Sequence, residues 1–215
     1  MSSINPYFTF NYDQPEDYHF SHDSVFLSRK VYEIIRAEKQ SPQAVLDLCA
    51  GCGIVGLDFI FHLQNNEYSL PKAVDFLEVQ DIYRQHFENN KQRLSAETKC
   101  HFLNLNYKDL ILQPELKNKY DLILCNPPYF RSGQGSLSDS EFKNRCRFFI
   151  DADFQDLLSS ISYSLSDTGK AYVLVKSLAV YGLDVELEMK AHNPNLRIKK
   201  IDVIRKTDLY EIKKS

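Results

Sequence analysis

The arrangement of apolar and polar positions changes repeatedly along the chain between two patterns. Short apolar runs rich in β-branched residues precede stretches in which apolar residues recur every three or four positions. Strands that alternate with amphipathic helices are typical of an α/β fold with a mostly parallel sheet and helices on both faces. The pattern predicts strands at 44–48, 73–79, 100–105, 120–125, 170–176, 197–204 and 209–213, and helices at 54–63, 81–94, 154–165 and 178–190.

The two ends of the chain differ from its middle. An aromatic-rich arm precedes a helix start at Ser21, so we expect residues 1–40 to form an arm and a helix that pack on a cofactor site, and residues 41–215 to form one domain. The last two strands are joined by 205–208, which is too short for a parallel crossover and predicts an antiparallel hairpin. Segment 131–140 holds two glycines and four serines, and we expect it to be mobile and to close over substrate.

Composition narrows the classes of protein. The chain of 215 residues is 43% hydrophobic and 26% charged, which is ordinary for a globular domain. No apolar run approaches the roughly 18 residues of a membrane span, and the N-terminus does not resemble a signal peptide. Five cysteines, an odd number, indicate reduced thiols in a cytoplasmic protein, and Cys49 and Cys52 lack the second ligand pair of a zinc site. A net charge of −3 is a mild argument against nucleic-acid binding, although a local basic patch is still compatible with it.

A glycine-rich loop follows the first predicted strand. The segment from Val45 to Gly56 reads as an apolar strand, an acid and a G-x-G-x-x-G that enters a helix. Glycines let a ligand approach the backbone, and the helix N-terminus offers free N–H groups. Glu78 closes the second strand, where a carboxylate can accept both hydroxyls of a ribose. These features fit a nicotinamide dinucleotide and S-adenosylmethionine alike.

Asp47 indicates which of these two cofactors the loop would bind. It lies at the strand end, before Gly51, where a carboxylate would repel a pyrophosphate. The same charge suits a cofactor that carries an ammonium and a sulfonium. The residues therefore favour S-adenosylmethionine over a nicotinamide cofactor.

The sequence Asn126-Pro127-Pro128-Tyr129 follows the fourth strand. Its two prolines fix φ and remove two backbone donors, so the loop is rigid. The Asn126 side chain and the Pro127 carbonyl offer two acceptors, and Tyr129 offers an aromatic face. Two acceptors on the N–H bonds of a flat amine or amide favour a pyramidal nitrogen and stabilise developing positive charge. The loop therefore predicts methylation of a planar NH2 nitrogen.

These motifs resemble those of class I S-adenosylmethionine-dependent methyltransferases of the Asn-Pro-Pro-Tyr type. The resemblance is strongest to the bacterial family that N6-methylates an anticodon-loop adenosine of valine tRNA. It covers nearly the whole chain and rests on Gln14-Pro15, Tyr18 to Val25, Val45 to Gly56, Glu78-Val79-Gln80 and Asn126 to Phe130.

The resemblance implies a Rossmann-like fold with a seven-stranded, mostly parallel sheet and a C-terminal antiparallel hairpin. It implies an enzyme that binds S-adenosylmethionine and RNA, with tRNA as the expected RNA, and that involves no metal and no membrane. The implied cofactor-binding residues are Ser24, Asp47, Cys49, Gly51, Gly53, Glu78, Val79, Asn106 and Asn126. The implied catalytic residues are Asn126, Pro127, Pro128 and Tyr129, and the implied substrate contacts are Tyr129, Phe130, Arg131, Arg145 and Arg147.

Other acceptors and other functions remain open at this stage. The same loop serves methylation of a glutamine amide in translation proteins and of guanine N2 in ribosomal RNA. The stretch Asn144 to Phe148 also departs from the Ala-Arg-His-Glu-like stretch of the tRNA enzymes, which leaves the acceptor open. A non-catalytic RNA-binding module and a nicotinamide oxidoreductase are the remaining alternatives. Basic residues gather at 131–147 and at 197–214, as phosphate contacts or as solvated surface.

Overall fold

The computed structural model describes residues 12–94, 97–131, 136–177 and 184–215. Within this part of the chain, seven strands form one sheet in the order β3-β2-β1-β4-β5-β7-β6. Strands β1 to β5 pair in parallel, whereas β7 lies antiparallel between β5 and β6. The strands are β1 (Ala44–Leu48), β2 (Ala73–Glu78), β3 (Lys99–Asn104), β4 (Tyr120–Cys125), β5 (Leu165–Val175), β6 (Leu196–Ile204) and β7 (Thr207–Lys214). The predicted mostly parallel sheet with a C-terminal antiparallel hairpin is confirmed.

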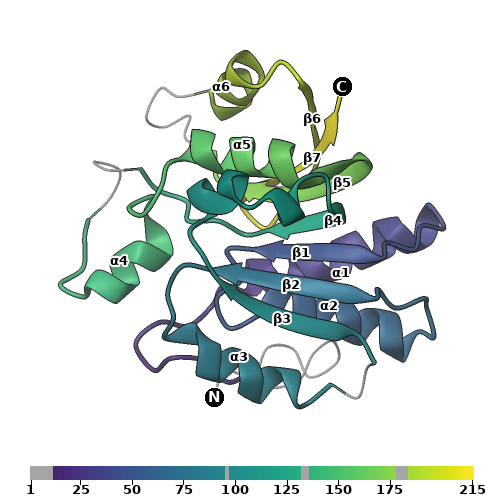
Figure 1. The fold of residues 1–215 in the computed structure, drawn as a ribbon. Helices are drawn as coiled ribbons and strands as arrows, with labels where there is room; N and C mark the ends of the chain where they lie inside the picture. Colours follow the sequence, from purple (N-terminus) through teal and green to yellow (C-terminus); the bar gives the residue numbers. More distant parts are fainter. Residues whose placement is uncertain (1–11, 95–96, 132–135, 178–183) are drawn as a thin grey trace.

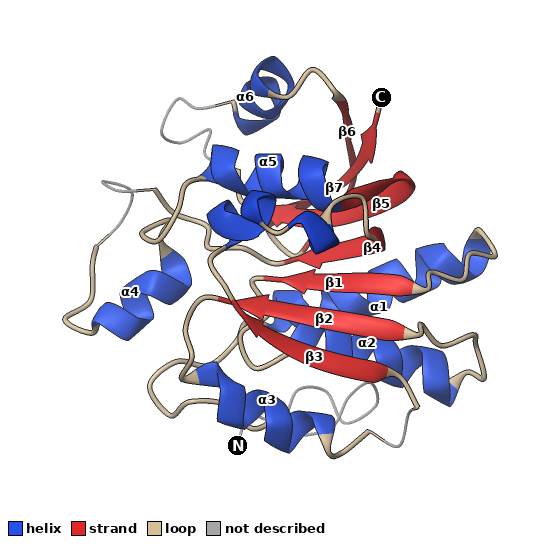
Figure 2. Ribbon diagram, in the orientation of Figure 1, coloured by secondary structure: helices blue, strands red, loops and turns tan. Residues whose placement is uncertain are grey.

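Helices cover both faces of the sheet (Figures 1 and 2). Alternate residues of each central strand point to opposite faces, so Val45 packs in one apolar cluster and Leu46 in the other. The first cluster joins the sheet to α1 (His22–Ala37), α2 (Ile54–Asn65) and α3 (Tyr83–Lys91). The second joins it to α5 (Phe154–Ser164), α6 (Val185–His192) and the 3-10 segments η1 (Tyr107–Leu112) and η2 (Pro114–Leu116). Both faces are buried, which explains why apolar residues of the central strands point to both faces, as in the run Leu122 to Cys125 of β4.

Two differences from the sequence prediction stand out, at α4 and at β5. Helix α4 (Glu141–Arg147) was not expected, because it buries no residue and therefore shows no apolar periodicity; Ser140 caps it by accepting from the Lys143 N–H. Strand β5 begins at Leu165, five residues before its predicted start, directly after α5. Part of the predicted helix 178–190 and part of the predicted mobile segment 131–140 fall on 178–183 and 132–135, which lie outside the described residues.

The parallel strands end along one edge of the sheet, and this edge positions the candidate site. Strand β1 lies between β2 and β4, so the ends of these three strands are neighbours. The sheet order runs outward in opposite directions from β1 and β4, which is the place where α/β proteins bind ligands. Figure 1 shows α4 beyond this same edge, facing the strand ends.

Candidate active site

A cavity of about 220 Å³ opens at the carboxyl edge of the sheet, between the ends of β1, β2 and β4. Each of these strand ends contributes a lining residue: Gly51 follows β1, Glu78 ends β2 and Asn126 follows β4. Twelve predicted site residues lie on its wall: Ser24, Cys49, Gly51, Glu78, Val79, Asn126, Pro127, Pro128, Tyr129, Phe130, Arg145 and Arg147. Four others, namely Asp47, Gly53, Asn106 and Arg131, are not among the lining residues.

The loop after β1 is held in an unusual backbone conformation. Gly51 and Gly53 have φ angles of 55° and 84°, and Cys49 adopts 63° although it is not a glycine. Gly53 also has no room for a side chain, because an added Cβ would lie 2.8 Å from Cδ2 of Phe87. The Ala50 N–H donates to the carbonyl of Leu77, 3.0 Å away, which ties the loop to β2. Gly53 therefore supports the loop from behind and does not form its surface.

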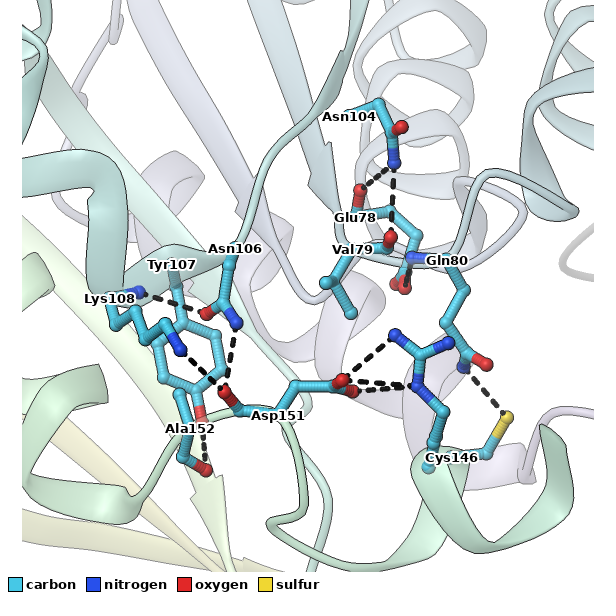
Figure 3. A network of polar contacts seen from close by, with 11 residues as sticks. Glu78, Val79, Gln80, Asn104, Asn106, Tyr107, Lys108, Cys146, Asp151 and Ala152 are labelled. Atoms are coloured by element: carbon cyan, nitrogen blue, oxygen red, sulfur yellow. Dashed lines mark hydrogen bonds and ion pairs between the residues drawn. The ribbon is translucent and has the colours of Figure 1, made fainter. Parts of the chain in front are cut away.

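Glu78 presents a fixed carboxylate to the cavity. One of its oxygens accepts from the Gly51 N–H and the other from the Gln80 N–H, each at 2.9 Å. Burial raises the pKa of Glu78, and the two backbone N–H groups act in the opposite direction. Figure 3 shows Glu78 beside Asn104, whose amide donates to the Glu78 and Val79 carbonyls at 3.0 and 3.1 Å. The end of β2 is therefore rigid before any ligand arrives.

Asp47 supports the loop and does not reach the cavity. Its side chain is fully buried, and Oδ2 accepts from the Gly56 N–H at 2.8 Å. Oδ1 has no hydrogen-bond partner among the described residues. Burial, with a smaller contribution from the charge of Glu78, raises the pKa of Asp47 to about 7, against the effect of the Gly56 N–H. In the structure this side chain holds the first turn of α2 against β1, and its contact with a cofactor stays a prediction.

Asn106 is likewise occupied by its own surroundings. Its amide donates to the Asp151 carbonyl at 2.9 Å and its oxygen accepts from the Lys108 N–H at 3.1 Å (Figure 3). The cavity wall on this side consists instead of Leu105, Tyr107 and Asp151. Asn106 thus caps η1 and fixes the backbone of the neighbouring wall, whereas the adenine contact that the resemblance implies is not on the cavity surface.

The Asn126–Tyr129 loop is anchored by side chains from distant segments. The Asn126 amide donates to Ser24 Oγ at 2.7 Å, and the Tyr129 hydroxyl donates to Asn126 Oδ1 at 2.7 Å. The same hydroxyl lies 3.4 Å from Asp23 Oδ2, and burial together with the Asp23 charge raises the pKa of Tyr129. The N–H groups of Tyr129 and Phe130 both donate to the Arg147 carbonyl at 3.0 Å. The loop is therefore fixed between α1 and the end of α4.

The predicted basic contacts divide into paired and unpaired side chains. Arg145 forms a two-pronged contact with Asp151, with Nε and Nη2 at 3.0 and 2.8 Å, and Arg131 Nη2 lies 2.6 Å from Glu188. Arg147 instead lies over the Phe130 and Phe148 rings, 5.8 and 5.4 Å from their centroids. Of the predicted arginines, the two with carboxylate partners are poorly placed to neutralise a phosphate.

Two parts of the site were missed at the level of sequence, whereas Asp23 lies within the stretch Tyr18 to Val25 on which the resemblance rests. Lys176 follows β5 as Asn126 follows β4, so the strand-end rule would also have found it. Cys146 Sγ lies 3.4 Å from the Gln80 amide (Figure 3) and 3.1 Å from the Tyr83 hydroxyl, but no local pattern links these residues.

Within the described ranges, no group of three or more His, Cys, Asp or Glu side chains is arranged to hold a metal ion. In the same part of the chain, no helix combines the length and the apolar character that crossing a bilayer demands.

Known proteins resemble this chain in sequence and in fold. A family model described as "Lysine methyltransferase" matches residues 21–128. Two proteins named tRNA1(Val) (adenine(37)-N6)-methyltransferase, from Flavobacterium psychrophilum and Aliivibrio fischeri, are each 27% identical, over 63% and 80% of this chain. The matches span 53% and 67% of those relatives, so the chain covers only about half to two thirds of their length.

The fold is shared with a solved methyltransferase. The 16S rRNA N2 G1207 methyltransferase of Thermus thermophilus, solved with AdoMet and guanosine, superposes with a TM-score of 0.60 at 17% identity, covering 93% of this chain and 45% of that one. This likeness confirms the predicted Rossmann-like methyltransferase fold. The family model spans half of the chain, from the residue that precedes α1 to the second proline after β4. The chain therefore belongs to this methyltransferase family.

Proposed function

We propose that the protein uses S-adenosylmethionine to methylate an exocyclic amine of an RNA nucleobase, adenine N6 in a tRNA anticodon loop. The observation that carries the proposal is the position of Asn126. Its side chain stands on a cavity that also contains the glycine loop and Glu78, and its oxygen is held 2.7 Å from the Tyr129 hydroxyl. Cofactor and acceptor groups thereby meet in one cavity.

The chain's own residues fit the cofactor. Glu78 would accept the ribose hydroxyls, and the backbone of the glycine loop would face the methionine part. Gln14 Nε2 lines the same cavity, is buried and has no partner among the described residues, while its Oε1 accepts from the Phe20 N–H at 3.1 Å. A free amide donor at this place suits the cofactor carboxylate. When bound, S-adenosylmethionine supplies a methyl group on a sulfonium.

The acceptor side suits a flat amine. Asn126 Oδ1 and the Pro127 carbonyl would accept the two N–H groups of the amine, and the Tyr129 ring would stack on its plane. Positive charge that develops on the nitrogen would be stabilised by these two fixed acceptors, and the nitrogen would then release a proton to water. No strong base is needed, because an aromatic ammonium is acidic.

The names of the relatives support adenine among the flat acceptors. The family description names lysine, but a lysine side chain is an ammonium with a pKa near 10.4 and must lose a proton before it can react. The acceptors of the Asn126–Tyr129 loop are neutral and its ring is planar, features that fit an aromatic amine better. Glutamine and guanine N2 share the planar NH2 and remain the alternatives that experiment must separate.

The test is the destination of a labelled methyl group. The purified protein would be incubated with radiolabelled S-adenosylmethionine and either unmodified tRNA or RNase-treated protein extract. Label is expected on tRNA and absent from protein, with a protein boiled beforehand as the control. Label on lysine or glutamine of a protein, with none on RNA, would refute the RNA proposal; label on guanine would overturn the choice of base alone.

A further inference from the structure

Two cations face the aromatic rings that follow the Asn-Pro-Pro sequence. Lys176 Nζ lies 5.0 Å from the Phe130 centroid and 6.0 Å from the Tyr129 centroid, and Arg147 Cζ lies 5.8 Å from the Phe130 centroid. Arg147 ends α4 and Lys176 follows β5, so segments far apart in sequence meet here. Among the described residues, neither cation has a carboxylate within 4.0 Å. Both charges therefore remain available for a ligand.

A third cation reaches the same place from the C-terminal hairpin. Strand β6 runs in the direction of β5, so the turn between β6 and β7 lies at the carboxyl edge. In that turn, Arg205 Nε lies 3.7 Å from Asp23 Oδ1, and its side chain is 53% exposed. The other Asp23 oxygen accepts from Thr207 Oγ1 at 3.2 Å and lies 3.4 Å from the Tyr129 hydroxyl. The Asp23 carboxylate thus lies between Arg205 and the Tyr129 hydroxyl and contacts both.

We infer that Arg147, Lys176 and Arg205 form a phosphate-binding rim around the Tyr129 and Phe130 rings, so that the acceptor is a nucleotide within a polyanion. This inference rests on the proposed function and names the substrate contacts of that site. It assigns the phosphate contacts to these three residues, because Arg145 and Arg131 are closely paired with Asp151 and Glu188, at 2.8 and 2.6 Å. Arg205 is included because it is 53% exposed and lies 3.7 Å from its carboxylate neighbour.

The rings and the cations would exchange partners when the substrate binds. In the free protein, each cation is stabilised over an aromatic face by about 0.5–1 kcal/mol where water has access. A nucleobase that stacks on Tyr129 or Phe130 competes for those faces, and its own flanking phosphates then offer the displaced Lys176 and Arg147 a stronger partner. A lysine substrate would be repelled by the rim, and a neutral glutamine would gain nothing from it.

RNA binding at several salt concentrations tests the rim. A fluorescently labelled tRNA anticodon stem-loop would be titrated with the wild-type protein and with Lys176→Gln, Arg147→Gln and Arg205→Gln. Lys176→Gln and Arg147→Gln should each weaken binding about fivefold or more and lower the salt slope by about one, and Arg205→Gln should act more weakly because Asp23 already faces it. The affinity for S-adenosylmethionine should stay unchanged, and the melting temperature should fall by only a few degrees, as expected for the loss of one cation–π contact, which separates lost phosphate contacts from misfolding.

Lys199→Gln is the matched control, because Lys199 is an exposed cation of the same hairpin with no carboxylate within 4.0 Å in the described structure. It should bind RNA like the wild type. The rim alone is overturned if the wild type methylates RNA while Lys176→Gln and Arg147→Gln keep its RNA affinity and salt slope. Methylation of protein with no methylation of RNA would instead overturn the proposed function, and the rim with it.

Discussion

The two halves of the candidate site are built in different ways. On the cofactor side, backbone N–H groups hold the acidic side chains in place. Glu78 accepts from the N–H groups of Gly51 and Gln80, and Asp47 accepts from that of Gly56. On the acceptor side, side chains from distant segments hold the loop in place, as where the Asn126 amide donates to Ser24 of α1. The first half is organised locally by strand ends and a glycine loop, whereas the second depends on the whole fold being assembled.

This difference implies that cofactor binding and acceptor recognition depend on separate residues, which mutation can test. Changes on the cofactor side should alter cofactor affinity or stability and leave acceptor recognition intact. Changes on the acceptor side should alter transfer or RNA binding and leave cofactor affinity intact. A variant that altered both together would show that the halves are coupled.

The largest effect is expected at Asn126. Asn126→Ala removes a fixed acceptor from the transfer step, so turnover should fall by about 10²-fold or more, as for loss of other preorganised polar groups. The affinity for S-adenosylmethionine should change little, as calorimetry would show. Turnover close to that of the wild type would mean that Asn126 only holds the loop to Ser24.

Glu78→Ala should act on the other half alone. It removes charge-assisted hydrogen bonds of order 1.5–3 kcal/mol, so affinity for S-adenosylmethionine should fall by about tenfold to a hundredfold. Asp81→Asn is the control, since Asp81 is an exposed acid nearby that pairs with Arg84 and does not line the cavity. Equal affinity in Glu78→Ala and the wild type by calorimetry would contradict the ribose role.

Asp47 should affect stability in a pH-dependent way. Because its pKa in the folded protein is raised to about 7 from 3.8, the folded state binds more protons than the unfolded state between those values, and stability falls as pH rises through this window. Each unit of pKa difference corresponds to about 1.4 kcal/mol. Asp47→Asn keeps an oxygen for the Gly56 N–H and removes the ionisation.

Denaturant unfolding at pH 5 and pH 8 checks this expectation. The wild type should lose more unfolding free energy between the two pH values than Asp47→Asn, by at least about 1 kcal/mol. Glu78, whose pKa is also raised, is present in both proteins and cancels from the difference. Identical losses would show that Asp47 is not a buried group with a raised pKa.

The smallest effect is expected from the Tyr129 hydroxyl. Tyr129→Phe removes its donation to Asn126 but keeps the ring, and one neutral hydrogen bond contributes about 0.5–1.5 kcal/mol, so turnover should fall less than about tenfold. Tyr129→Ala also removes the stacking surface and should raise KM for RNA further. If Tyr129→Phe were as damaging as Tyr129→Ala, the hydroxyl and not the ring would be the functional part.

The same contrast explains what could be predicted from the sequence. Strands β1 and β4 were predicted with the bounds that the structure has, because buried parallel strands leave mostly apolar runs, here interrupted only by Asp47 and Asp121. Helix α4 was missed because it buries nothing, although it supplies Arg147 and Cys146 to the cavity. Periodicity reports burial, so an element that packs on the core through only two half-buried side chains, here Phe142 and Cys146, leaves little such signal.

Side-chain roles were harder to predict than side-chain positions. Glu78 was placed correctly on the cavity, because a strand end fixes where it lies. Asp47 was placed at the right strand end, but it faces the Gly56 N–H, which depends on how α2 packs on β1. The pairing of Arg145 with Asp151 was invisible for a similar reason, since it depends on how the chain turns back after α4.

Identification of the methylated atom tests the central claim most directly. The protein would be incubated with S-adenosylmethionine and an anticodon stem-loop RNA, and in parallel with the same RNA in which purine riboside, which lacks the N6 amine, replaces each unpaired adenosine. Mass spectrometry of the digested RNA should find N6-methyladenosine from the first RNA and no methylated nucleoside from the second. Equal methylation of both RNAs, or of neither while a protein lysine is methylated, would contradict an active site built for the exocyclic amine of adenine.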